Sequence, residues 1–119
     1  MDNQVNINYV EFSVTDIEAT KSFFSEAFGW TFIDYGPDYA SFSNRGLDGG
    51  FSQSTGLPAS DGGALIVLYS ADLKATLKRV EQAGGIICKP IFAFPGGRRF
   101  HFVEPGGNQL AVWSDKVED

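Results

Sequence analysis

The sequence predicts a mixed α+β domain built from two β-α-β-β-β modules that follow one another along the chain. The chain repeats itself, because residues 16–29 (DIEATKSFFSEAFG) match residues 72–85 (DLKATLKRVEQAGG) at an offset of 56 residues. Runs rich in β-branched and aromatic residues flank each copy. Turns that contain glycine and proline separate these runs.

Each copy of the repeat has the pattern of an amphipathic helix. Asp16 and Asp72 suit the N-cap position, because a carboxylate accepts hydrogen bonds from the unpaired amides of the first turn. Gly29 and Gly84 suit the left-handed conformation that ends a helix. Apolar residues recur at helical spacing, namely Ile17, Phe24, Ala27 and Phe28 in the first copy and Leu73, Leu77, Val80 and Ala83 in the second. We therefore expect two helices of about four turns.

Strands are expected on both sides of each helix. Their ranges are 7–14, 31–35, 39–43 and 50–53 in the first module, and 64–69, 86–90, 98–103 and 109–113 in the second. The first module spans about residues 5–54 and the second about 63–115, and the polar, glycine-rich stretch at about 55–62 links them. Neither module has enough mass to bury its own sheet face, so we expect residues 1–119 to form one domain.

Charge and composition exclude several classes of partner. The formal charge of −6 at pH 7 argues against nucleic acid and against an anionic membrane surface. The polar start of the chain lacks the pattern of a signal peptide, and no apolar run reaches the length of a membrane span. The single cysteine, Cys88, lies in an apolar run and suits a buried position in a reducing compartment. We expect a cytoplasmic protein.

Three segments carry a resemblance to a known family. They are residues 10–17 (VEFSVTDI), 24–30 (FSEAFGW) and 102–108 (FVEPGGN), and with the repeat they cover nearly the whole chain. The pattern resembles the vicinal oxygen chelate superfamily, which includes glyoxalase I, bleomycin resistance proteins and extradiol dioxygenases. The resemblance implies that the two sheets form a cupped, incomplete β-barrel with the helices outside. It also implies a homodimer, and a divalent metal held in the cup by His and Glu side chains.

The metal positions that the resemblance implies are occupied by unsuitable residues in this chain. They fall on Tyr9, Leu65 and Ala111. Leucine and alanine offer no lone pair, and a protonated phenol is a poor ligand for the usual divalent ions. The chain has a single histidine, so a site with two histidines and a carboxylate cannot form within one subunit. We therefore expect no metal cofactor.

Strand alternation predicts which side chains line the cup, because residues two apart share a face of a sheet. On the first strand these are Tyr9, Glu11 and Ser13, while Val10, Phe12 and Val14 pack under the helices. In the second module the predicted cup residues are Leu65, Val67, Tyr69, Arg99, His101, Val103, Gln109, Ala111 and Trp113.

Glu11 and His101 are the candidate catalytic residues. A carboxylate in the middle of a strand suits a general base or a ligand acceptor, but also an ion pair with Arg98 or Arg99 or simple exposure at the rim. Histidine changes charge near neutral pH and suits a proton shuttle, although a lone histidine on a strand is also common as a plain hydrogen-bonded residue.

The candidate ligand-binding residues are aromatic, polar or cationic. They are Tyr9, Ser13, Phe51, Tyr69, Arg99 and Trp113. Arginine suits a two-point contact with a carboxylate or phosphate, and the aromatic side chains suit a flat apolar ligand. Trp30 fits such a surface and the core equally well.

The sequence leads to one principal functional hypothesis and two alternatives. The principal one is a glyoxalase/bleomycin-resistance-like protein that binds a small organic molecule in its cup without a metal. Binding would serve to sequester the molecule or to perform an acid-base step with Glu11 and His101. One alternative is a metal-dependent lyase or isomerase of the lactoylglutathione lyase type, with ligands from Glu11, His101 or Glu104 or across a dimer. The other is an interaction module without a ligand, so enzyme activity stays open.

Overall fold

A computed structural model of the chain describes residues 7–54 and 64–116. The first module contains β1 (Tyr9–Val14), α1 (Ile17–Phe28), β2 (Ile33–Asp34), β3 (Tyr39–Arg45) and β4 (Leu47–Gln53). The second contains β5 (Ile66–Tyr69), α2 (Leu73–Gln82), β6 (Ile86–Phe94), β7 (Gly97–Val103) and β8 (Gln109–Ser114). The predicted α+β class with two β-α-β-β-β modules is confirmed. The expected linker at 55–62 lies outside the described residues.

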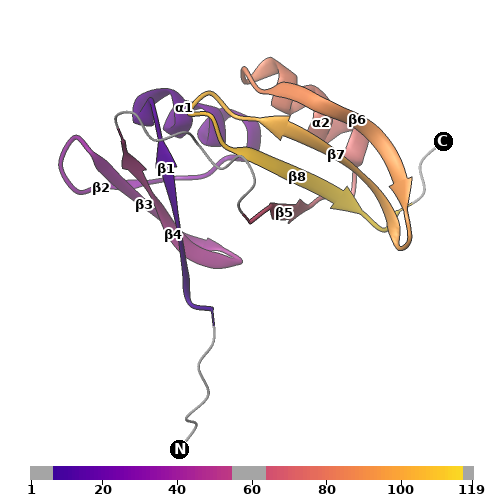
Figure 1. Cartoon of the computed structure of the whole chain (residues 1–119), viewed down its shortest axis with the longest axis horizontal. Coiled ribbons are helices and arrows are strands. Elements are labelled where there is room, and N and C mark those ends of the chain that lie inside the picture. Colours follow the sequence, from indigo (N-terminus) through magenta and orange to yellow (C-terminus); the bar gives the residue numbers. More distant parts are fainter. Residues whose placement is uncertain (1–6, 55–63, 117–119) are drawn as a thin grey trace, which may run out of the picture.

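Each module forms its own four-stranded sheet, and the two sheets have the same topology. The strand order is β1-β4-β3-β2 in one sheet and β5-β8-β7-β6 in the other. The strand before each helix runs parallel to the last strand of its module, and the other neighbours are antiparallel. Figure 1 shows the first sheet on the left and the second on the right, with both helices toward the top. The described strands do not close into a barrel.

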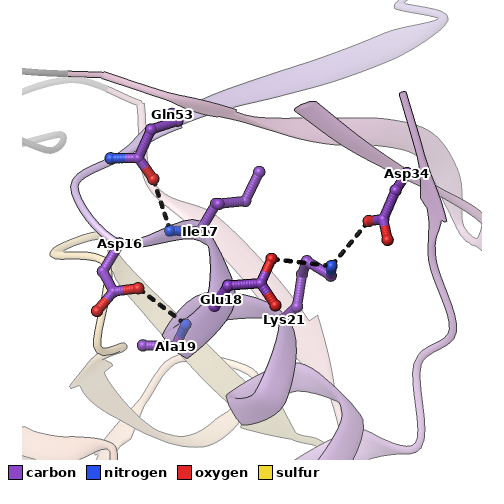
Figure 2. A network of polar contacts seen from close by, with 7 residues as sticks. All are labelled: Asp16, Ile17, Glu18, Ala19, Lys21, Asp34 and Gln53. Atoms are coloured by element: carbon purple, nitrogen blue, oxygen red, sulfur yellow. Dashed lines mark hydrogen bonds and ion pairs between the residues drawn. The ribbon is translucent and has the colours of Figure 1, made fainter. Parts of the chain in front are cut away.

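The start of α1 is fixed by side chains from two directions (Figure 2). Asp16 caps the helix as expected, because its carboxylate accepts from the backbone N–H of Ala19 at 3.1 Å. Gln53, at the end of β4, accepts from the N–H of Ile17 at 2.8 Å. The same side-chain amide donates to the carbonyl of Thr15 at 2.8 Å. These bonds hold the helix against its sheet.

Charged side chains also cap α2 and join α1 to the edge strand β2. Asp72 caps α2 by accepting from the N–H of Ala75 at 3.1 Å, which confirms the second predicted cap. On α1, Lys21 pairs with Asp34 of β2 at 2.8 Å and with Glu18 at 3.3 Å (Figure 2). Exposed pairs of this kind contribute little to stability, but the bond to β2 joins the helix to the edge strand.

The two modules share one core. Phe23 of α1 is fully buried, and its ring lies 5.6 Å from that of Phe102 on β7. The helices α1 and α2 also contact each other. Val14 is buried and Val10 and Phe12 are half-buried, so the first strand turns its apolar set toward the helices as predicted. Within the described ranges no helix is long and apolar enough to span a membrane.

Three strands differ most from the expected ranges. β2 has only two residues, β4 begins at Leu47, and β6 continues to Phe94 instead of ending at Pro90. The helices are also shorter than four turns, with 12 residues in α1 and 10 in α2. The expectation that Cys88 is buried is wrong, because its side chain is exposed on the edge strand β6. The register of that strand shifts between residues 87 and 89, next to the cysteine.

Candidate functional site

Each sheet has one face that packs on the helices and one face that stays open. In the first sheet the open face carries Tyr9, Glu11 and Ser13 of β1, which are all exposed as predicted. The register places Gly50 of β4 beside Glu11, and Tyr39 of β3 two positions farther along on the same face. We call this surface the first open face.

Two tyrosines meet on the first open face above a glycine. The phenol oxygens of Tyr9 and Tyr39 are 2.5 Å apart. A Cβ atom at position 50 would collide with both phenol oxygens, so Gly50 leaves the space in which the tyrosines meet. Burial raises the pKa of Tyr39, and its hydrogen bonds with Tyr9 and Glu11 raise it further. The Tyr39 phenol therefore keeps its proton and donates to a neighbouring acceptor.

Sequence reasoning missed Tyr39. The alternation of the segment 39–43 shows which residues share a face with Tyr39, but not which face of the sheet that is. The pairing of β3 with β4 and of β4 with β1 decides the face.

The open face of the second sheet carries the predicted residues of β5, β7 and β8. The register aligns Val67 with Ala111 and His101, and aligns Tyr69 with Trp113 and Arg99. We call this surface the second open face. β6 adds to it two aromatic residues that lie beyond the predicted end of that strand, because Phe92 pairs with Arg99 and Phe94 with Gly97.

The second open face contains a hollow of about 370 Å³. It is lined by Val67, Phe94, Pro95, Gly96, Arg99 and Trp113. The ring of Trp113 lies 5.3 Å from that of Tyr69 and 6.2 Å from that of Phe94, both in edge-to-face arrangements. Aromatic walls with one cationic group form a surface suited to a flat organic molecule.

His101 lies on the second open face but is almost completely covered. Only 3% of it is exposed, and its Nδ1 atom is 3.1 Å from the side-chain nitrogen of Gln109. Burial lowers the pKa of His101, and the positive charges of Arg99 and Lys89 lower it further. The imidazole is therefore neutral at pH 7.

The structure does not bring the two candidate catalytic residues together within one chain. Glu11 belongs to the first sheet, where it helps to raise the pKa of Tyr39, whereas His101 belongs to the second sheet and bonds with Gln109. The first open face is acidic around Glu11, and the second is basic because Arg99 and Lys89 lie beside the neutral His101.

Phe51 does not lie on an open face. It is 1% exposed, and its ring packs on those of Phe12, Phe24 and Phe42 at 5.2 to 5.4 Å. Its predicted place in the cup is wrong, because the register of β4 turns it toward α1. Trp30 is half-buried and packs against the core, with its ring stacked on Phe24 at 4.7 Å.

The donor set does not fit the metal that the resemblance implies. Of the three implied ligand positions, Tyr9 bonds with Tyr39, and Leu65 and Ala111 have no donor atom in their side chains. Glu104, a ligand in the lyase alternative, is buried and already accepts hydrogen bonds from its own turn and from α1. In the described part of the chain, no three His, Cys, Asp or Glu residues lie together as a metal site requires.

Comparison with known proteins defines the class. Residues 6–112 match the model of the Glyoxalase/Bleomycin resistance protein/Dioxygenase superfamily, and the chain belongs to this family. A sequence relative is the "Anthracycline biosynthesis protein DauV" of Streptomyces sp. (strain C5), 30% identical over 122 residues. The match covers 86% of this chain but 44% of that protein, so the chain spans less than half the length of this relative.

Solved structures share the fold. A glyoxalase-related enzyme from Fulvimarina pelagi superposes with a TM-score of 0.78 at 19% identity, over 92% of this chain and 87% of that one. TnmS3, an antibiotic binding protein from Streptomyces sp. CB03234, superposes with a TM-score of 0.69 at 21% identity, over 96% and 98%. At these identities the likeness shows the fold alone.

Proposed function

We propose that the chain binds a small organic molecule on the open faces of its sheets and needs no metal to do so. The observation that carries this proposal is the hollow of about 370 Å³ on the second open face, between Phe94 and Trp113. Its volume lies within the range of small-molecule sites, and its walls are aromatic with a single guanidinium group from Arg99.

The relatives support an aromatic ligand. One is named for anthracycline biosynthesis and another for antibiotic binding. Anthracyclines are flat aromatic molecules, and flat aromatic molecules suit the walls of this hollow. We propose that the ligand of this chain belongs to the same broad chemical class.

The ligand is either sequestered or altered by an acid-base step, and we propose Glu11 and His101 for the latter. Glu11 is exposed and lies beside the protonated phenol of Tyr39. An exposed carboxylate in this position suits a base that accepts a proton from a ligand. His101 is neutral and buried. Because the two lie on different sheets, a ligand that touches both has to span the space between two open faces.

We propose that a second copy of the chain supplies the facing surface. The first open face presents the carboxylates of Glu11 and Asp48, whereas the second presents Lys89 and Arg99. In a two-fold dimer, the first face of each protomer meets the second face of its partner, and the charges attract. Sedimentation equilibrium is expected to give twice the 12.9 kDa mass at micromolar concentration. A single-chain mass at every concentration tested would contradict the dimer.

The cytoplasm is the proposed location. The free Cys88 is exposed, and an exposed unpaired thiol suits a reducing compartment.

A fluorescence titration with an anthracycline tests the binding proposal. The chain has two tryptophans, and Trp113 borders the hollow while Trp30 is half-buried against the core, outside the lining of this hollow. We expect saturable quenching in the wild type and the loss of most of that quenching in Trp113→Phe, which leaves Trp30 as the remaining emitter. Calorimetry that detects no binding of this or any other aromatic compound would favour the interaction module.

The variant Glu11→Ala tests the role of the first open face in the same assay. Because Glu11 is exposed, its loss is expected to leave the melting temperature almost unchanged. Weaker binding with unchanged stability supports a ligand contact, whereas changed stability with unchanged binding leaves Glu11 only a structural role.

A further inference from the structure

Two buried N–H groups on the second open face have no hydrogen-bond partner. Among the described residues, Arg99 Nε and His101 Nε2 are the buried side-chain nitrogen atoms in this state. They belong to residues two apart on β7, so both side chains lie on the same face of the sheet. Buried polar groups are nearly always paired, because an unpaired one has lost its hydrogen bonds to water without replacing them. Two such groups side by side indicate a missing acceptor.

The proton on His101 can be assigned from its neighbour. The side-chain nitrogen of Gln109 is a donor only, and it lies 3.1 Å from Nδ1 of His101. Nδ1 therefore accepts, and in the neutral ring the proton is on Nε2. The lowered pKa of His101 agrees with a neutral ring. The unpaired Nε2 atom is thus a donor that lacks an acceptor.

The guanidinium of Arg99 is held by two aromatic rings. Its central carbon lies 5.3 Å from the centre of the Phe92 ring and 5.2 Å from that of Phe94. These contacts orient the guanidinium but give Nε no acceptor. Phe92 also lies 5.8 Å from the ring of His101, so one aromatic side chain borders both unpaired donors.

The hollow gives a ligand access to Arg99, and His101 lies two residues farther along the same face of β7. Arg99 lines the hollow, and Trp113 and Phe94 form its walls. A planar ring in the hollow would lie against these aromatic walls, and an acceptor group on its edge would point toward Arg99. A carboxylate fits best, because it accepts from two donors and its charge matches that of the guanidinium.

We propose that Arg99 and His101 form a subsite for the carboxylate of a planar aromatic acid whose ring occupies the hollow. This inference rests on the proposed function and names the chemical class of its ligand. Arg99 supplies the charge, and His101 supplies a neutral donor at a fixed angle. Because both donor atoms are buried, the side chain of Phe92, which borders both residues, has to shift for the carboxylate to reach them.

Calorimetry with two matched probes tests the subsite. 2-Naphthoate carries the carboxylate, and 2-naphthamide has the same ring and a similar shape without the charge. We expect naphthoate to bind the wild type at least about tenfold more tightly than the amide, because hydrogen bonds to charged groups are the stronger ones. In Arg99→Gln the preference should disappear while the amide binds as before.

Arg98→Gln is the matched control. It removes the same charge one residue earlier, on the opposite face of β7, and should keep the preference for naphthoate. His101→Phe keeps a ring and removes the donor, and should weaken naphthoate severalfold with little effect on the amide. Thermal melts establish that each variant is folded. If His101→Phe fails to fold, the comparison of Arg99→Gln with its control Arg98→Gln still tests the subsite.

The outcomes separate this inference from the proposed function. Equal binding of the two probes to the wild type, or an unchanged preference in Arg99→Gln, overturns the subsite. Binding of an anthracycline without binding of naphthoate also overturns it and leaves the proposed function standing. If no aromatic compound binds, both proposals are wrong.

Discussion

Replacing Glu104 with alanine is expected to lower the free energy of unfolding by about 3–5 kcal/mol, because it leaves several buried donors without an acceptor. Glu104 is 1% exposed. A typical domain is stable by about 5–15 kcal/mol, so this loss would remove a large part of the total. Urea unfolding followed by circular dichroism measures the change.

The carboxylate of Glu104 accepts from three residues. Oε1 accepts from the hydroxyl of Thr20 at 2.8 Å and from the backbone N–H of Gly106 at 2.6 Å. Oε2 accepts from the backbone N–H of Asn108 at 3.2 Å and from its side-chain amide at 2.8 Å. The same amide also donates to the carbonyl of Ser13 at 3.1 Å. Glu104 thus connects the turn before β8 to α1 and β1 of the other module.

Two further variants serve as comparisons for Glu104→Ala. Glu26→Ala removes an exposed carboxylate from α1 and should change stability by less than about 0.5 kcal/mol. Thr20→Val removes one of the four donors and should cost about 1 kcal/mol. If Glu104→Ala unfolds at the urea concentration of the wild type, the network does not stabilise the contact between modules.

The elements with strong local signals could be predicted from the sequence. The two Asp caps and the apolar spacing of 16–29 and 72–85 depend on contacts a few residues apart, and both helices form there. The alternation of β1 likewise places Val14 in the core and Glu11 on the open face. Local chemistry is sufficient where neighbours in sequence are also neighbours in space.

The elements that depend on long-range pairing could not be predicted. β4 begins at Leu47 although Asp48, Gly49 and Gly50 disfavour strands, because both β1 and β3 pair with it. β6 continues past Pro90, since it is an edge strand with a register shift that tolerates the missing N–H. The aromatic residues that border Arg99 lie in this continuation, so the sequence did not show them as part of the site.

Replacing Phe51 with alanine tests which face of β4 that residue occupies. The structure places Phe51 in the core, so the substitution is expected to lower the free energy of unfolding by about 3–5 kcal/mol, the usual cost of removing a buried ring. Neighbouring glycines explain why the sequence misled. Gly49 and Gly50 offer no side chain whose polarity would mark a face of β4. The pairing of Phe51 with Phe12, which packs against the core, assigns Phe51 to the buried face.

Tyr69→Ala is the matched control, because Tyr69 and Phe51 were expected on one aromatic surface and the structure separates them. Tyr69 is 52% exposed, and its loss should cost less than about 1 kcal/mol. A small stability change in Phe51→Ala together with a selective loss of aromatic ligand binding would mean that Phe51 lines the cup and not the core. A large change in Phe51→Ala and a small one in Tyr69→Ala would instead mean that Phe51 belongs to the core between β4 and α1, where its ring packs on Phe24, and that Tyr69 belongs to an open surface.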